Sequence, residues 1–172
     1  SSQRSRSKTN HRSRNYYSLM EKLKLIIQVT RLDKPIGFML LFWPCAWGLT
    51  LAYSFNPEKK FYYYYLLLFF IGSVLMRSAG CIVNDIVDKD FDKKVERTKK
   101  RPIASGKLSV FSALSYTIVL CLIALTILLQ FNLLTICLGL GSMFLAFGYP
   151  FMKRLTYWPQ LFLGLTFNWG II

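Results

Sequence analysis

Acidic residues gather in one short stretch of this chain, between positions 84 and 96. It holds five of the chain's eight acidic residues: Asp85, Asp88, Asp90, Asp92 and Glu96. On a helix that continues to Asp92, about 60° separates the directions of Asp85, Asp88 and Asp92. Asn84 flanks this face, whereas Asp90 points away from it. Carboxylates on one face repel one another, but together they suit a hard divalent cation, which takes oxygen ligands.

Basic residues follow the carboxylates at once. Between positions 93 and 107 the chain carries Lys93, Lys94, Arg97, Lys99, Lys100, Arg101 and Lys107. Cations beside carboxylates suit a polyphosphate that is bound through Mg²⁺. The alternative interpretation is a solvated loop whose charges only keep it in water. A calcium-binding EF-hand loop is excluded, because Lys93 stands where the turn glycine belongs and Lys99 where the bidentate glutamate belongs.

The composition is that of a membrane protein. The chain has 172 residues, of which 53% are hydrophobic, and its mean hydropathy is +0.35. The apolar residues form blocks long enough to span a bilayer, which predicts an all-α fold, a polytopic bundle of about four or five transmembrane helices. The net charge of +14 does not indicate nucleic acid, because the basic residues cluster beside the apolar blocks as the positive-inside rule describes. We therefore expect membrane lipid as a partner and no nucleic acid.

Cysteine and histidine chemistry has no support in the sequence. The four cysteines are scattered through apolar segments without a CxxC pair, and the only histidine, His11, lies in the basic N-terminal tail. The sequence therefore indicates neither a zinc site nor thiol or histidine catalysis.

Five apolar segments follow a polar N-terminal region. Residues 1–14 are rich in Arg and Ser and predict a disordered basic tail, which is either part of a mitochondrial transit segment or a bare tail. A helix at the membrane interface is predicted next from a stripe at helical spacing: Leu19, Leu23, Ile26, Ile27 and Thr30. Spans are then expected at residues 35–53, 61–83, 108–130 and 133–147, with a fifth segment running to the chain end. Arg77 lies inside the second span, where an ionisable side chain indicates a functional site.

The distribution of Lys and Arg predicts the orientation of these spans. Basic residues crowd the N-terminal part up to Lys34, the loop at 85–107, and the pair Lys153 and Arg154. The other side has only Lys59 and Lys60. All three basic regions are therefore expected to face one compartment, the cytosol or the mitochondrial matrix.

Four motifs resemble one protein family. NDIVDKDFD at 84–92 fits the pattern NDxxDxxxD, and it is accompanied by LDKPIG at 32–37, RTKKRP at 97–102 and YPFMKR at 149–154. From about residue 31 to its end, the chain resembles UbiA-type intramembrane aromatic prenyltransferases, most closely the mitochondrial 4-hydroxybenzoate branch of ubiquinone synthesis. Members of this family have about nine spanning helices and a second Asp-rich motif, DxxxD, whereas this chain has no acidic residue after Glu96. We therefore expect residues 15–172 to be the truncated N-terminal part of such a domain, inactive by itself.

The resemblance implies transfer of a polyprenyl group from all-trans polyprenyl diphosphate to 4-hydroxybenzoate, with Mg²⁺ as cofactor. The catalytic residues would be Asp85, Asp88 and Asp92. Mg²⁺ with its diphosphate is expected at these three aspartates and at Asn84. Further diphosphate contacts are expected from Arg97, Lys100 and Arg101, and contacts to the aromatic acid from Arg77, Lys153 and Arg154. The implied location is the mitochondrial inner membrane, multi-pass, with the site facing the matrix and other ubiquinone-synthesis proteins as partners. A bacterial plasma membrane with a cytoplasmic site is the alternative.

Three other interpretations stay open. A relative of the same family could use another acceptor, haem or naphthoate. A truncated membrane protein could bind a lipid diphosphate without chemistry. A transporter would instead need charged residues near the centres of its spans, and only Arg77 lies within one.

Overall fold

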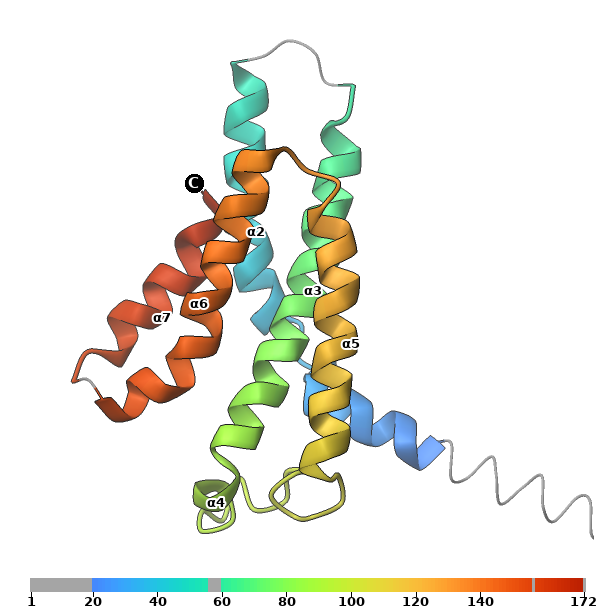
Figure 1. The fold of residues 1–172 in the computed structure, drawn as a ribbon, viewed down its shortest axis with the longest axis vertical. Coiled ribbons are helices and arrows are strands. Elements are labelled where there is room, and N and C mark those ends of the chain that lie inside the picture. Colours follow the sequence, from blue (N-terminus) through green and yellow to red (C-terminus); the bar gives the residue numbers. More distant parts are fainter. Residues whose placement is uncertain (1–19, 56–59, 156, 172) are drawn as a thin grey trace, which may run out of the picture.

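The fold is a bundle of helices that run along one long axis (Figure 1). The computed structural model describes residues 20–55, 60–155 and 157–171, so the predicted basic tail at 1–14 lies outside the described residues. Every regular element in the described residues is helical. This confirms the predicted all-α class.

The helices follow one another through short connections. A helix over residues 20–30, called the N-terminal helix below, is followed by α2 (Ile36–Ser54), α3 (Tyr62–Val87), α5 (Val110–Leu128) and α6 (Leu133–Leu155). The short elements are α4 (Lys89–Asp92), α7 (Pro159–Asn168) and a 3-10 turn, η1 (Trp169–Ile171).

Four helices are long and apolar enough to cross a membrane: Ile36–Ser54, Tyr62–Val87, Val110–Leu128 and Leu133–Met152. They agree with the four full spans predicted from the sequence. The fifth apolar segment forms α7 and η1, and α7 with its 10 residues is too short to cross a bilayer as a helix.

α3 is the central helix of the bundle. It packs against α2, α5 and α6, and it is more buried than the other three spans. Its 26 residues reach about 39 Å at 1.5 Å per residue, whereas the hydrocarbon core of a bilayer is about 30 Å thick. The excess length carries the last turns of α3, with Asn84 and Asp85, to one end of the bundle.

Aromatic side chains hold the opposite end together. The ring of Tyr62 lies 5.4 Å from that of Tyr53, and its hydroxyl is 2.9 Å from Thr50 Oγ1. Phe131, between α5 and α6, packs on Tyr65 and Phe69 of α3. Aromatic rings with polar tips are typical of a membrane–water interface.

A small core lies beneath the acidic end. It consists of Val29, Ile82, Ile103 and Ala113, each at most 1% exposed. These residues come from the N-terminal helix, α3, the segment at 93–109 (called the basic loop below) and α5. The basic loop therefore folds back against the bundle and does not extend freely into water.

The N-terminal helix leaves the bundle sideways at this same end (Figure 1). Its last residues, Val29 and Thr30, are buried, whereas Leu23 and Ile27 are 45% and 42% exposed. The predicted single stripe is therefore divided: Thr30 faces the protein, and Leu23 and Ile27 form an exposed strip. Leu19 lies outside the described residues. An exposed apolar strip on a helix that leaves the bundle sideways fits a position at the membrane interface.

Candidate active site at the end of α3

Two carboxylates are buried at the acidic end. Asp85 is 2% exposed and Asp92 is 7% exposed. Asp85 belongs to α3, and Asp92 ends α4, which contacts α3. A buried carboxylate destabilises a fold strongly unless cations or hydrogen-bond donors surround it, so the partners of these two residues define the site.

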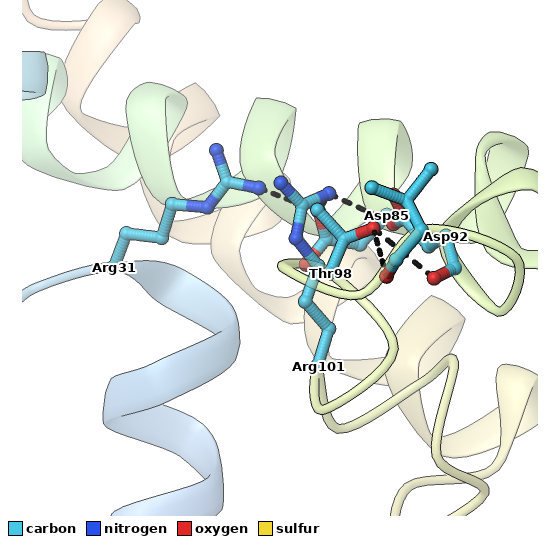
Figure 2. A network of polar contacts seen from close by, with 6 residues as sticks. Arg31, Asp85, Asp92, Thr98 and Arg101 are labelled. Carbon is cyan, nitrogen blue, oxygen red and sulfur yellow. Dashed lines mark hydrogen bonds and ion pairs between the residues drawn. The ribbon is translucent and has the colours of Figure 1, made fainter.

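Two arginines bind these carboxylates (Figure 2). Arg31 Nη2 lies 2.6 Å from Asp85 Oδ1. Arg101 Nη1 lies 3.1 Å from the same oxygen and 2.8 Å from Asp92 Oδ2. Thr98 Oγ1 donates a hydrogen bond to the backbone carbonyl of Asp92 at 3.1 Å. The network thus joins the end of the N-terminal helix, the end of α3 and the basic loop.

Asp88 is the single residue between α3 and α4. Its φ of −86° and ψ of 2° lie in the bridge region of the backbone map. Helical hydrogen bonds nevertheless continue through it, from Asp88 N–H to the Asn84 carbonyl at 2.9 Å and from Asp92 N–H to the Asp88 carbonyl at 2.8 Å. The helix predicted to continue to Asp92 is therefore interrupted at one residue but keeps its hydrogen-bonding pattern. That continuity brings Asp85 and Asp92 to the same side.

Asp90 points to the surface. Its side chain is 84% exposed, and its Oδ1 lies 3.0 Å from Lys93 Nζ. The hydrogen bond from Lys93, together with the Lys93 charge, lowers the pKa of Asp90 below its ordinary value. Glu96 is equally exposed and pairs with Lys99 at 2.7 Å. Exposed pairs of this kind contribute little to stability, which separates these two acids from the buried network.

The acidic end has the oxygen donors that Mg²⁺ prefers, and arginines contact its two buried carboxylates. Across the part of the chain that the structure describes, no three His, Cys, Asp or Glu side chains form a group able to hold a metal ion. Arg101 binds both Asp85 and Asp92, and the other predicted ligands, Asn84 and Asp88, are half-buried nearby in the chain. The oxygen atoms of these four side chains are of the kind that Mg²⁺ takes as ligands.

The predicted diphosphate contacts lie on the basic loop. Arg97 and Lys100 are exposed, whereas Arg101 turns inward to the carboxylates. The predicted acceptor contacts Lys153 and Arg154 belong to the end of α6, and their side chains lie outside the described part of the chain.

Arg77 lies deeper, inside the span formed by α3. It precedes Asp85 by eight positions, about 12 Å along the helix axis. Its guanidinium carbon is 5.7 Å from the ring centre of Phe167 in α7. Gly37 in α2 leaves space for it, because a Cβ at Gly37 would stand 2.6 Å from Arg77 Nε. A cation–π contact and a close backbone approach thus hold this cation inside the bundle.

An apolar cavity of about 840 Å³ lies among α2, α3, α5, α6 and α7. Its lining includes Leu41, Met76, Leu125, Met143 and Phe167. Phe167 also contacts Arg77, so the cavity adjoins that cation. Cavities of about 300–1,000 Å³ with apolar walls and few polar groups are typical small-molecule sites.

Known proteins are similar to this chain in sequence and in fold. Residues 41–172 match the UbiA prenyltransferase family. This chain belongs to that family. It is 52% identical to the mitochondrial 4-hydroxybenzoate polyprenyltransferase of Caenorhabditis elegans, over 87% of this chain and 42% of that protein. It is 47% identical to the 4-hydroxybenzoate octaprenyltransferase of Hydrogenovibrio crunogenus, over 88% of this chain and 52% of that protein.

The UbiA-family chain spans about half the length of these relatives or less. A solved UbiA homolog from Aeropyrum pernix K1, in its apo form, is similar in fold, with a TM-score of 0.66 and 28% sequence identity. The similarity covers 77% of this chain and 46% of that one. The family match begins at residue 41 and therefore includes the acidic end, the basic loop and the cavity, but not Arg31.

The sequence indicated no role for Arg31, Thr98 or Phe167 in this UbiA-family site. Arg31 precedes Asp85 by 54 positions, and the only signal for it was its place directly before the LDKPIG motif. Thr98 belongs to the motif RTKKRP, but the motif indicates no contact for it. Phe167 is one of many aromatic residues in apolar segments. Contacts between distant segments assign the roles of Arg31 and Phe167, whereas Thr98 donates to a carbonyl six positions before it.

Proposed function

We propose that this UbiA-family chain belongs to an enzyme that transfers a polyprenyl group from all-trans polyprenyl diphosphate to 4-hydroxybenzoate in ubiquinone synthesis. Relatives at 52% and 47% identity carry that aromatic acid and a prenyl transfer in their names. One structural observation carries the proposal: the buried Asp85 of the charged end lies on the same helix as Arg77, and Arg77 adjoins an apolar cavity of about 840 Å³. A polyprenyl diphosphate has the same two parts, a charged head and a long apolar tail.

The charged end is suited to the diphosphate. Oxygen donors for Mg²⁺ are offered by Asn84, Asp85, Asp88 and Asp92. A bound Mg²⁺ would supply positive charge against the charge that develops on the departing diphosphate. The exposed Arg97 and Lys100 are free to approach diphosphate oxygens, where charge-assisted hydrogen bonds are strong. Arg101 adds a third cation between these side chains and the carboxylates.

Arg77 is suited to the acceptor. A guanidinium inside an apolar bundle pairs readily with the carboxylate of 4-hydroxybenzoate, and the side chains of Lys153 and Arg154 remain the other candidates. The C–O bond between the allylic carbon and diphosphate breaks, the ring carbon ortho to the hydroxyl attacks the allylic cation that is left, and the ring loses a proton. The products are 3-polyprenyl-4-hydroxybenzoate, diphosphate and that proton. Apolar cavity walls keep water from capturing the allylic cation.

The proposal extends to the location. Four helices suited to cross a membrane make this a membrane protein. We place it in the mitochondrial inner membrane with its acidic end toward the matrix and with other ubiquinone-synthesis proteins as partners, because several similar proteins are named mitochondrial. The relative from Hydrogenovibrio crunogenus supports the bacterial plasma membrane, with a cytoplasmic site, as the alternative.

Expression of the whole gene that encodes this chain, in a bacterium without its own 4-hydroxybenzoate polyprenyltransferase, tests the proposal. We expect its membranes to convert labelled 4-hydroxybenzoate and a polyprenyl diphosphate into the 3-polyprenyl product, to stop when EDTA removes Mg²⁺, and to resume when Mg²⁺ returns. Prenylation of a naphthoate or of haem instead would contradict the acceptor. Binding of polyprenyl diphosphate without transfer to any acceptor would favour a protein that holds the lipid and does no chemistry.

A further inference from the structure

Arg31 has an unusual backbone conformation. Its φ is +55°, and among the described non-glycine residues it is the only one with a positive φ. The left-handed region is unfavourable for any residue with a Cβ, so it is normally occupied by glycine. The same chain follows that rule at Gly106, whose φ is +76°. Arg31 therefore stands at a position where the backbone alone would favour glycine.

Arg31 ends the N-terminal helix. The Leu32 N–H donates to the Ile27 carbonyl at 3.3 Å, five residues back, which is the closing bond of a Schellman motif. In that motif the left-handed residue is usually glycine. The two preceding residues, Val29 and Thr30, are 0% and 5% exposed, so the helix end is anchored in the core. The left-handed turn therefore starts from a fixed point, and the direction of the Arg31 side chain is fixed with it.

That direction leads to Asp85. Arg31 Nη2 lies 2.6 Å from Asp85 Oδ1, and the Arg31 side chain is only 27% exposed. Arg101 reaches the same oxygen at 3.1 Å, but it also binds Asp92 at 2.8 Å. Asp85 thus has one arginine of its own and one that it shares. If Arg101 turned toward a bound diphosphate, Arg31 would still hold the buried Asp85 carboxylate.

We propose that Arg31 is a positioning residue for the acidic end: its left-handed turn directs the guanidinium onto Asp85 and fixes the orientation of that carboxylate. The role of the oriented Asp85 in diphosphate binding rests on the function proposed above. Arg31 acts through Asp85 and does not itself contact the substrate. The side-chain contact with Asp85 explains why an arginine stands where glycine would relax the backbone.

A double-mutant cycle tests the contact without any assay of the reaction. Thermal unfolding is measured for the protein in lipid nanodiscs with Arg31→Gly, Asp85→Asn and both changes. We expect Arg31→Gly to lower the unfolding temperature of the otherwise native protein, because the buried carboxylate loses its own cation. In the Asp85→Asn background the sign reverses, and Arg31→Gly raises the unfolding temperature, because only the backbone relief remains. A rise in both backgrounds, or an equal fall in both, would overturn the proposal.

Kinetics then test the positioning role. In membranes that carry the whole gene product, Arg31→Gly should lower kcat/KM for polyprenyl diphosphate by about 10–100-fold, the usual effect of losing a residue that orients a ligand-binding carboxylate. KM for 4-hydroxybenzoate should stay unchanged, and Arg31→Lys, which keeps a cation, should restore part of the loss. Lys34→Ala, which removes an exposed cation from the same turn, is the matched control without effect.

The outcomes separate the two proposals. Full kcat/KM in the Arg31→Gly protein would overturn the positioning role while the proposed function stands. An unaltered protein that transfers no prenyl group would contradict the proposed function, and the unfolding cycle would then decide whether Arg31 orients Asp85.

Discussion

Two kinds of acidic residue occur in the same short stretch at the end of α3. Asp85 and Asp92 are buried and share Arg101. Asp90 and Glu96 are exposed and pair with lysines three positions later. A buried charge requires an opposite charge or hydrogen-bond donors in good geometry, whereas water can replace the partner of an exposed charge. Substitutions at single positions can therefore distinguish the site from the surface around it.

Asp88 and Asp90 form the sharpest pair for such a comparison. Asp88→Asn is expected to reduce polyprenyl transfer about tenfold or more and to raise the Mg²⁺ concentration that transfer requires, because one hard oxygen donor is lost. Asp90→Asn is expected to alter transfer less than about twofold, since changes of surface charge are usually worth less than about 0.5 kcal/mol. The measurement is the transfer rate against Mg²⁺ concentration in membranes that carry the whole gene product. Equal losses in both variants would rule out a metal site on the face shared by Asp85 and Asp88.

Gly37 offers a second comparison, this time for the acceptor. Gly37→Ala places a methyl group 2.6 Å from Arg77 Nε, so the guanidinium must move. We expect KM for 4-hydroxybenzoate to rise about tenfold, the effect of weakening one charge-assisted hydrogen bond, while KM for polyprenyl diphosphate stays the same. Gly80→Ala adds the same methyl group to α3 where nothing lies within 4 Å, and it serves as the control. An unchanged KM for 4-hydroxybenzoate would remove Arg77 from the acceptor site.

At the scale of elements, local hydrophobicity predicted the spans and little beyond them. Hydrophobicity ended the second span at residue 83, and only the spacing of the aspartates indicated the helix beyond it, where α3 continues to Val87 and includes Asp85. Asp85 is charged, so an apolar pattern ends before it. The helix continues because Arg31 and Arg101, which are remote from Asp85 in the chain, compensate that charge. The sequence also did not predict that the basic loop folds back, because this too depends on contacts between distant segments. Ile103 packs in a core to which four segments contribute.

The contribution of Ile103 to this fold-back can be measured. Ile103→Ala is expected to lower the free energy of unfolding by about 2–5 kcal/mol, the usual cost of truncating a large buried side chain. It should also speed proteolysis at the lysines of the basic loop, because a loop that has lost its buried anchor leaves the bundle more often. Arg101, two positions before Ile103, would move with the loop. Val95→Ala, in the same loop at a side chain that is 49% exposed, should change stability by less than about 0.5 kcal/mol. Similar effects of both changes would show that the loop is not anchored through Ile103.

At the scale of the whole molecule, the chain has two unlike ends with an apolar body between them. One end holds the carboxylates, the two arginines and the basic loop, and the other holds paired aromatic rings. The cavity lies within the apolar body and adjoins Arg77. An amphipathic lipid diphosphate can occupy such a molecule in one direction only, with its head at the charged end. Under the function proposed above, the chemistry would take place on one face of the membrane, and the orientation of the bundle would decide which compartment exchanges the diphosphate.

The positive-inside rule predicts that orientation, and cysteine labelling can test it. Eight Lys or Arg side chains occur between positions 85 and 107, whereas the link between α2 and α3 carries only Lys59 and Lys60. The end of α2 and the start of α3 lie at the opposite end of the bundle from α4 (Figure 1). In the whole gene product, with its native cysteines replaced by alanine, Lys100→Cys and Lys60→Cys are exposed separately to a membrane-impermeant maleimide. In sealed vesicles of known orientation we expect the reagent to reach Lys100→Cys only from the matrix or cytosolic side and Lys60→Cys only from the other side, because moving several Lys and Arg side chains across the bilayer is strongly unfavourable. Labelling of both positions from one side would overturn the topology, and with it the placement of the charged end toward the matrix.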